Sequence, residues 1–281
     1  MKKFIISIDA GTTSNRSILF NLKGQPVYSC QKEFTQYFPK NGWVEHDPEE
    51  IWRTTLKTLR EVIQKAKKLK GKILSIGITN QRETTILWNK QNGKPVYRAI
   101  VWQDRRTEEF CKKLRNKNKE TMIFNKTGLL IDPYFSGTKI KWIIENVPNA
   151  RNLMNKKQLL FGTIDSFLIW RLTKGKIHAT DATNASRTMI YNITNNKWDE
   201  KILNLLKIKK HILPTVKDCA DDYGQTSSSV TGISIPINGV VGDQQSATIG
   251  QCCFEPGSLK STYGTGAFVL LNTGNKKIYS K

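Results

Sequence analysis

The sequence predicts an α/β protein, from an opening β-hairpin and from later apolar strands that alternate with helices. Residues 4–8 form an apolar, mostly β-branched run, and residues 17–20 form a second one. Residues 27–34 alternate well enough to continue an antiparallel meander. Asp47 and Pro48 then begin an amphipathic helix that we expect to end near Gly71, and residues 73–79 follow as a buried strand.

The turn of the opening hairpin reads Asp9-Ala10-Gly11-Thr12-Thr13-Ser14. Glycine reaches backbone angles closed to other residues, so successive N–H groups can face an anion, and the three hydroxyls that follow Gly11 are further donors. Asp9, at the end of the strand, suits a magnesium ion or its water ligands. We interpret this stretch as a phosphate-binding hairpin; the alternative is an ordinary turn made by Asp9 and Gly11.

Two later strands also end in polar residues. Residues 73–79 run into Asn80-Gln81-Arg82-Glu83, and residues 239–241 run into Gly242-Asp243 and a helix of small residues. In-line phosphoryl transfer needs one carboxylate for the metal and one for the hydroxyl proton, which Asp9 and Asp243 would supply. The sequence lacks Walker, Rossmann, zinc, haem and flavin motifs, so a nucleotide would be held by Gly-Thr turns such as the one ending at Thr265.

Composition excludes several classes of protein. No apolar run reaches the roughly 18 residues that span a bilayer, and the run that starts the chain breaks at Asp9, before a signal-peptide core forms. We therefore predict a cytoplasmic protein without membrane insertion. Five cysteines without C-x-x-C spacing predict reduced thiols, and the three scattered histidines predict structural roles.

The formal net charge of +22 invites a nucleic-acid-binding hypothesis. The lysines are spread along the chain in ones and twos, however, which is typical of a solvated basic surface. We predict no nucleic-acid partner, and retain a basic RNA- or DNA-binding protein as a minor alternative.

Several segments together resemble the glycerol kinases of the FGGY carbohydrate kinase family. Two long stretches carry the resemblance, residues 42–48 (GWVEHDP) and 78–85 (ITNQRETT), and further matches lie at residues 8–14, 102–106, 132–138, 184–188 and 242–245. The resemblance implies the actin-like ATPase fold, in which two ribonuclease-H-like domains enclose a catalytic cleft. Residues 1–250 would form the N-terminal FGGY kinase domain, and residues 251–281 the opening strands of a second, truncated C-terminal domain.

The resemblance also implies an activity, ATP-dependent phosphorylation of glycerol to sn-glycerol 3-phosphate, and a set of residues for it. Hydroxyls of glycerol would be bound by Arg82, Glu83, Tyr134, Asp243 and Gln244, and its carbons would be covered by Trp102. The phosphates of ATP would be bound by Thr12, Thr13, Ser14, Arg16 and Thr265, with Mg²⁺ at Asp9 and Asp243 and with Asp243 as the general base. A homo-oligomer is implied for the full-length form.

Each residue of this set also has a structural interpretation. Arg82 and Glu83 would then form a surface ion pair, Trp102 a core aromatic and Tyr134 a loop anchor.

The chain departs from the family pattern in three places. Ala10 stands where many relatives have Gln, and Ser234 stands where certain bacterial relatives have an arginine for fructose 1,6-bisphosphate, so the sequence does not predict regulation by that ligand. The sequence stops at Lys281, a little beyond half the family's usual length, so we expect the segments that hold adenine and ribose to be missing. A fragment, a truncated gene and half of a split enzyme all fit this ending.

Two further hypotheses stay open. One is a kinase for another polyol or sugar, and the other is a non-catalytic, truncated remnant. Residues 257–272 resemble the opening strands of the second domain, and in this chain by itself we expect the apolar side chains at 268–271 to lie in water.

Overall fold

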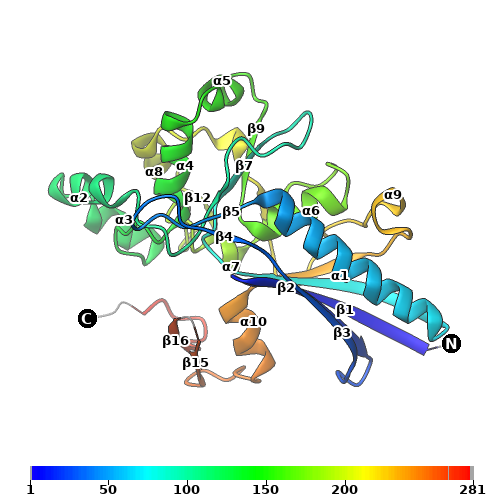
Figure 1. The fold of residues 1–281 in the computed structure, drawn as a ribbon. Helices are drawn as coiled ribbons and strands as arrows, with labels where there is room; N and C mark the ends of the chain where they lie inside the picture. Colours follow the sequence, from blue (N-terminus) through cyan, green and yellow to red (C-terminus); the bar gives the residue numbers. More distant parts are fainter. Residues whose placement is uncertain (1, 265, 279–281) are drawn as a thin grey trace.

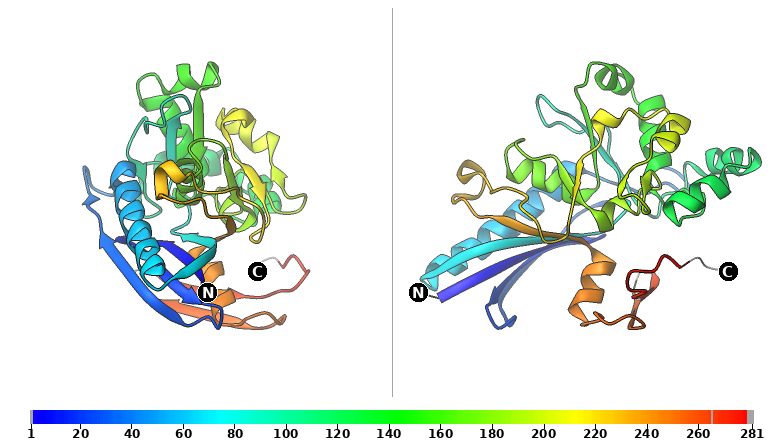
Figure 2. Two further views of the ribbon diagram at one scale, coloured as in Figure 1. Left: turned by 90° about the vertical axis from the view of Figure 1, so that its right-hand side faces the viewer. Right: turned by 180° about the vertical axis from the view of Figure 1, so that it is seen from behind.

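The computed structural model describes residues 2–264 and 266–278. A five-stranded sheet runs through it in the order β14-β6-β1-β2-β3 (Figures 1 and 2). Its strands are β1 (Lys2–Ala10), β2 (Ser14–Asn21), β3 (Pro26–Glu33), β6 (Gly71–Asn80) and β14 (Ile237–Gly242). β1, β2 and β3 pair antiparallel, whereas β6 pairs parallel with both β1 and β14. The predicted antiparallel meander is confirmed, and the sheet continues in parallel from β1.

The long helix α1 (Pro48–Lys68) covers one face of this sheet. Asp47 caps its N-terminus by accepting a hydrogen bond from the Glu49 amide at 2.9 Å, as predicted. The helix ends at Lys68, earlier than predicted, and Lys70 takes the left-handed turn with φ +52°. Gly71 instead begins β6, where a Cβ atom would lie 2.1 Å from the ring of Phe4. Glycine is therefore needed for strand packing and not for the helix cap.

Most of the remaining elements form a second layer, drawn largely in green and yellow in Figure 1. Its helices are α2 (Glu108–Asn116), α3 (Glu120–Thr127), α4 (Ser136–Asn146), α5 (Ala150–Asn155), α6 (Ile164–Leu172), α7 (Ala182–Ala185), α8 (Glu200–Leu206), α9 (Ser228–Thr231) and the 3-10 helix η1 (Lys210–Ile212). Its strands pair as β4 (Gln36–Tyr37), β5 (Glu45–His46) and β8 (Ala99–Ile100); β7 (Ile86–Asn89) and β9 (Leu159–Gly162); β10 (Ala179–Asp181) and β13 (Thr215–Lys217); and β11 (Tyr191–Asn192) and β12 (Lys197–Trp198).

Two apolar cores hold these layers. The first lies between the five-stranded sheet, α1 and α6, and includes Ile6, Leu59 and Phe167. The second lies between the helices α2, α3, α4, α5 and α8 and the strands β7 and β9, and includes Ile143 and Phe161. The loop before α4, which carries Tyr134, packs on this second core and is thereby held against the end of the sheet.

The last described segment lies on one side of the sheet, and the helices α2–α8 lie on the other (Figures 1 and 2). It consists of α10 (Asp243–Gly250) and an antiparallel pair, β15 (Leu259–Tyr263) and β16 (Ala267–Leu271). Val269 is 60% exposed and Leu271 53% exposed, as expected. Phe268 and Leu270 are half-buried, so the expectation that all of residues 268–271 lie in water is wrong. The physical reason at Phe268 is an edge-to-face contact with Trp102, at 6.2 Å between ring centroids.

A buried carboxyl group lies behind the sheet. Asp165 of α6 is fully buried, and it accepts hydrogen bonds from Thr163 Oγ1 at 2.5 Å and Thr180 Oγ1 at 2.6 Å. Burial, with the nearby charge of Asp181, raises the pKa of Asp165 to about 7.

The raised pKa of Asp165 predicts that stability falls as pH rises. In the unfolded chain this group titrates near pH 3.9, so the folded state binds its proton more tightly and loses that advantage as pH rises towards 7. We expect the melting temperature to fall by a few degrees between pH 5 and pH 8, and to fall less in Asp165→Asn. Thermal unfolding followed by circular dichroism measures this, with the exposed Asp222→Asn as control. Equal slopes in all three proteins would contradict the prediction.

Candidate functional site

The carboxyl ends of three parallel strands meet at one edge of the sheet. In the register of the ladders, Ala10 of β1 lies opposite Asn80 of β6, and Asn80 lies opposite Gly242 of β14. The turn after Asp9, the segment of residues 80–83 and the carboxylate of Asp243 therefore converge, as the sequence predicts for an open α/β sheet.

A small cavity of about 130 Å³ lies at this edge. It is lined by Thr12 and by all six residues predicted to bind substrate, namely Arg82, Glu83, Trp102, Tyr134, Asp243 and Gln244. Among the described residues, Thr262, Gly264, Gly266 and Phe268 also line it, and none of these four was predicted to bind the substrate. Pockets for drug-sized ligands run to roughly 300–1,000 Å³, so this cavity is small by comparison.

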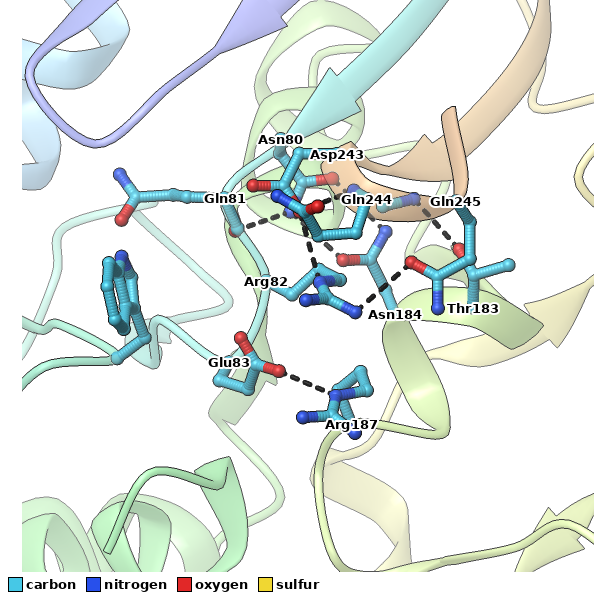
Figure 3. Close-up of polar contacts among 12 residues, drawn as sticks. Asn80, Gln81, Arg82, Glu83, Thr183, Asn184, Arg187, Asp243, Gln244 and Gln245 are labelled. Carbon is cyan, nitrogen blue, oxygen red and sulfur yellow. Dashed lines mark hydrogen bonds and ion pairs between the residues drawn. The ribbon is translucent and has the colours of Figure 1, made fainter. Parts of the chain in front are cut away.

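Arg82 lies in the cavity wall beside Asp243 (Figure 3). Its side chain is 6% exposed, and its Nε lies 3.0 Å from Asp243 Oδ1. That ion pair lacks hydrogen-bond geometry, so the Nε–H of Arg82 has no acceptor among the described residues. The Nη1 group donates to Gln245 Oε1 at 3.2 Å. A surface ion pair between Arg82 and Glu83 is therefore the wrong interpretation, because both side chains are buried and each pairs elsewhere.

Glu83 is held in a strained backbone conformation. Its φ is +61°, in the left-handed region, at a cost on the order of 1–3 kcal/mol. Its carbonyl accepts a hydrogen bond from Ser136 Oγ at 3.0 Å, and its Oε1 lies 2.7 Å from Arg187 Nε (Figure 3). Arg187 also stacks over the rings of Tyr134 and Phe135. Sequence reasoning missed Arg187, although it lies in the matched segment of residues 184–188.

Asp243 begins α10, and its side chain accepts a hydrogen bond from the backbone N–H of Gln244 at 2.7 Å. Burial raises the pKa of Asp243; the charge of Arg82 lowers it, and the charges of Glu83 and Asp9 raise it. The side chain of Asp243 is nevertheless 37% exposed. Asp243 is thus a stronger base than an ordinary aspartate and remains open to the cavity.

Aromatic rings form the apolar side of the cavity. Trp102 contacts Tyr134 edge-on at 5.7 Å between centroids, and its Nε1 donates to Thr12 Oγ1 at 3.0 Å. Burial raises the pKa of Tyr134 to about 12, and the nearby charge of Glu83 acts in the same direction. The phenol therefore stays protonated at neutral pH and can donate a hydrogen bond.

The opening hairpin differs from its prediction in two contacts. The Gly11 N–H donates to the Ser14 carbonyl at 3.0 Å, so it closes the turn and does not face an anion. Asp9 Oδ2 lies 2.9 Å from Arg16 Nη2, so residues expected to bind a metal and a phosphate pair with each other. Thr13 is exposed beside them, while Thr265 lies outside the described residues.

Within residues 2–264 and 266–278, no group of three or more His, Cys, Asp or Glu side chains is placed to hold a metal ion. Asp9 and Asp243 are near enough for their charges to interact. Two carboxylates fit a magnesium ion whose other ligands are phosphate oxygens and water. Across the same part of the chain, no helix is long and apolar enough to cross a membrane.

A buried polar network joins the strand ends behind the cavity. Asn80 and Asn184 exchange two side-chain hydrogen bonds, at 3.0 and 3.1 Å (Figure 3). The Gly242 amide donates to Thr183 Oγ1 at 2.8 Å, and Asp181 caps α7. Helix α7 therefore fixes the ends of β6 and β14 relative to each other.

Comparison with known proteins identifies the family. The model of the "FGGY family of carbohydrate kinases, N-terminal domain" matches residues 4–250. This chain belongs to the FGGY family. The FGGY relatives with solved structures share the actin-like ATPase fold expected from the sequence.

Glycerol kinases are among the most similar FGGY proteins. Those of Sinorhizobium fredii and Rhizobium meliloti are 58% and 57% identical over 281 residues, which is 100% of this chain and 56% of theirs. The structure of Plasmodium falciparum glycerol kinase with ADP superposes with a TM-score of 0.95 at 41% identity, covering 99% of this chain and 56% of that one. Gluconate kinase from Lactobacillus acidophilus superposes with a TM-score of 0.84 at 25% identity, covering 96% and 54%. The chain thus spans about half the length of the relatives it matches.

Proposed function

We propose that this chain carries the acceptor site and the phosphate-binding hairpin of an ATP-dependent glycerol kinase, which forms sn-glycerol 3-phosphate. The observation that carries the proposal is the cavity itself, where a buried arginine, two carboxylates, an amide and an aromatic wall surround about 130 Å³. The similarity to glycerol kinases supports the same substrate.

The acceptor site suits a small triol. Arg82, Glu83 and Gln244 offer charged and polar contacts to hydroxyls, Tyr134 offers a phenol, and Trp102 covers the carbon chain. A site built around hydroxyls rejects analogues that leave its buried polar groups unpaired. Arg82, Glu83 and Trp102 favour glycerol over the substrates of the alternative polyol or sugar kinase.

Asp243 is proposed as the general base. Its carboxylate takes the proton of the attacking hydroxyl as the bond from that oxygen to the γ-phosphorus forms and the bond from the γ-phosphorus to the leaving ADP oxygen breaks. The raised pKa of Asp243 suits this role, and the adjacent Arg82 keeps the ionised form accessible.

The remaining roles concern the nucleotide. Its phosphates are proposed to bind at the hairpin and at the second Gly-Thr turn, through Thr12, Thr13, Ser14, Arg16 and Thr265. Asp9 and Asp243 would hold Mg²⁺, which when bound neutralises charge on the phosphate oxygens.

The domain division is proposed from the end of α10 at Gly250, with residues 1–250 as the N-terminal domain and residues 251–281 as the start of a second. Cytoplasmic location and homo-oligomerisation of the full-length form stay predictions.

Glycerol binding to Arg82→Ala tests this proposal. We expect the parent chain to bind glycerol with a change in the fluorescence of Trp102, and Arg82→Ala to bind it more weakly by about 2–4 kcal/mol, or roughly 30- to 900-fold, because a charge-assisted contact is lost. Arg53→Ala, which removes an arginine with a side chain 67% exposed, is the matched control. Unchanged affinity in Arg82→Ala would exclude the role of Arg82. Tighter binding of xylulose or erythritol than of glycerol would favour the alternative kinase.

A further inference from the structure

Lys260 is buried in a hairpin whose side chains are otherwise largely exposed. It is 4% exposed, whereas its neighbour Leu259 is 56% exposed and Tyr263 at the end of β15 is 83% exposed. A buried ammonium group is costly unless it is paired. Among the described residues, its hydrogen-bond acceptor is Gln244 Oε1, at 2.6 Å.

This contact fixes whether the oxygen or the nitrogen of the Gln244 side-chain amide faces the cavity. An ammonium group has only donors, so Gln244 must turn its carbonyl oxygen towards Lys260. Gln244 is itself 8% exposed and lines the cavity, so its Nε2 is left to donate towards a ligand. The two ends of an amide are nearly equal in shape, and without Lys260 either end would fit.

The charges around Lys260 agree with a site-facing position. Burial lowers the pKa of Lys260, the charge of Asp243 raises it and the charge of Arg82 lowers it. Lys260 and Arg82 therefore both lie within electrostatic reach of the Asp243 carboxylate.

We propose that Lys260 is a positioning residue of the acceptor site, which holds the Gln244 amide with its NH₂ group towards the ligand. The inference rests on the proposed function, because the ligand is the polyol of that site. Lys260 lies beyond residue 250, where the match to the N-terminal family model ends. A residue of the segment after residue 250 thus orients the side-chain amide of Gln244, which belongs to the segment before it.

Nuclear magnetic resonance of the Gln244 side-chain amide tests the contact without any ligand. The resonance pair is assigned by its absence in Gln244→Ala, at a concentration where sedimentation shows a monomer. We expect it to shift and broaden in Lys260→Met and to stay in place in Lys276→Met, a control at an exposed lysine of the same segment. An unchanged pair in Lys260→Met would overturn the proposal. If Lys260→Met disrupts the hairpin, nuclear Overhauser effects between the Lys260 and Gln244 side chains of the parent decide instead, and their absence overturns it.

A double-mutant cycle tests the link to binding. We expect Lys260→Met to weaken glycerol binding about tenfold in the parent, and less than about twofold in the Gln244→Ala background. A merely structural role would give equal losses in both backgrounds, and that result would overturn the proposal. If the parent itself binds no glycerol, the proposed function fails, while the amide spectra still decide the role of Lys260.

Discussion

The purified 281-residue polypeptide is expected to form ADP from ATP and glycerol at least about 100-fold more slowly than an intact relative. Phosphoryl transfer requires ATP and acceptor to be clamped in a cleft that excludes water. Under the proposed function, the described residues would supply one wall of that cleft, and the hairpin β15/β16 leaves Val269 and Leu271 more than half exposed. We also expect the polypeptide to self-associate through this apolar surface.

A coupled assay of glycerol-dependent ADP formation measures the first effect, and sedimentation measures the second. The C-terminal half of a glycerol kinase relative, purified separately and added to the assay, is the informative control, because turnover should return if that half completes the cleft. Turnover by the polypeptide alone near that of an intact relative would show the prediction wrong.

Asp243→Asn is expected to lower turnover by about 10²- to 10⁴-fold in the active form, whether that is the polypeptide alone or the polypeptide with the added C-terminal half. An amide cannot accept the hydroxyl proton, yet it keeps the shape of the side chain. Glycerol affinity should therefore fall far less than kcat. Steady-state kinetics separate the two parameters, and Asp218→Asn, at an exposed aspartate, is the matched control.

The pH dependence gives a second readout of the same residue. The base must be ionised, and burial raises the pKa of Asp243, so activity should fall with decreasing pH at a higher pH than an ordinary aspartate near 3.9 would give. Near-normal kcat in Asp243→Asn, or an acidic limb at the ordinary value, would exclude Asp243 as the base.

Much of the fold was predictable because its signals are local. The cap at Asp47 and the apolar runs of β1, β6 and β14 each depend on a few consecutive residues. Strand ends that carry polar residues then indicated the edge where the cavity lies. The boundary near Gly71 was misjudged because the reason for that glycine is the ring of Phe4, 67 positions earlier in the chain and adjacent only once β1 and β6 pair.

The remaining site features depend on contacts between distant residues. Arg187 reaches Glu83 across 104 positions, and Lys260 reaches Gln244 from the other side of a turn. A lysine among many in a chain of net charge +22 carries no local mark of burial. The pairing of Asp9 with Arg16 was also missed, because both were considered as partners of a ligand and not of each other.

Gly242 limits how this site can diverge among related sequences. A Cβ atom at that position would lie 2.7 Å from Arg82 Cδ and 2.8 Å from Arg82 Cγ, and Arg82 is too confined by Asp243 and Gln245 to move aside. A side chain at position 242 therefore requires Arg82 to move, which would break its contacts with Asp243 and Gln245. We therefore expect related sequences with a larger residue at position 242 to carry a residue shorter than arginine at position 82.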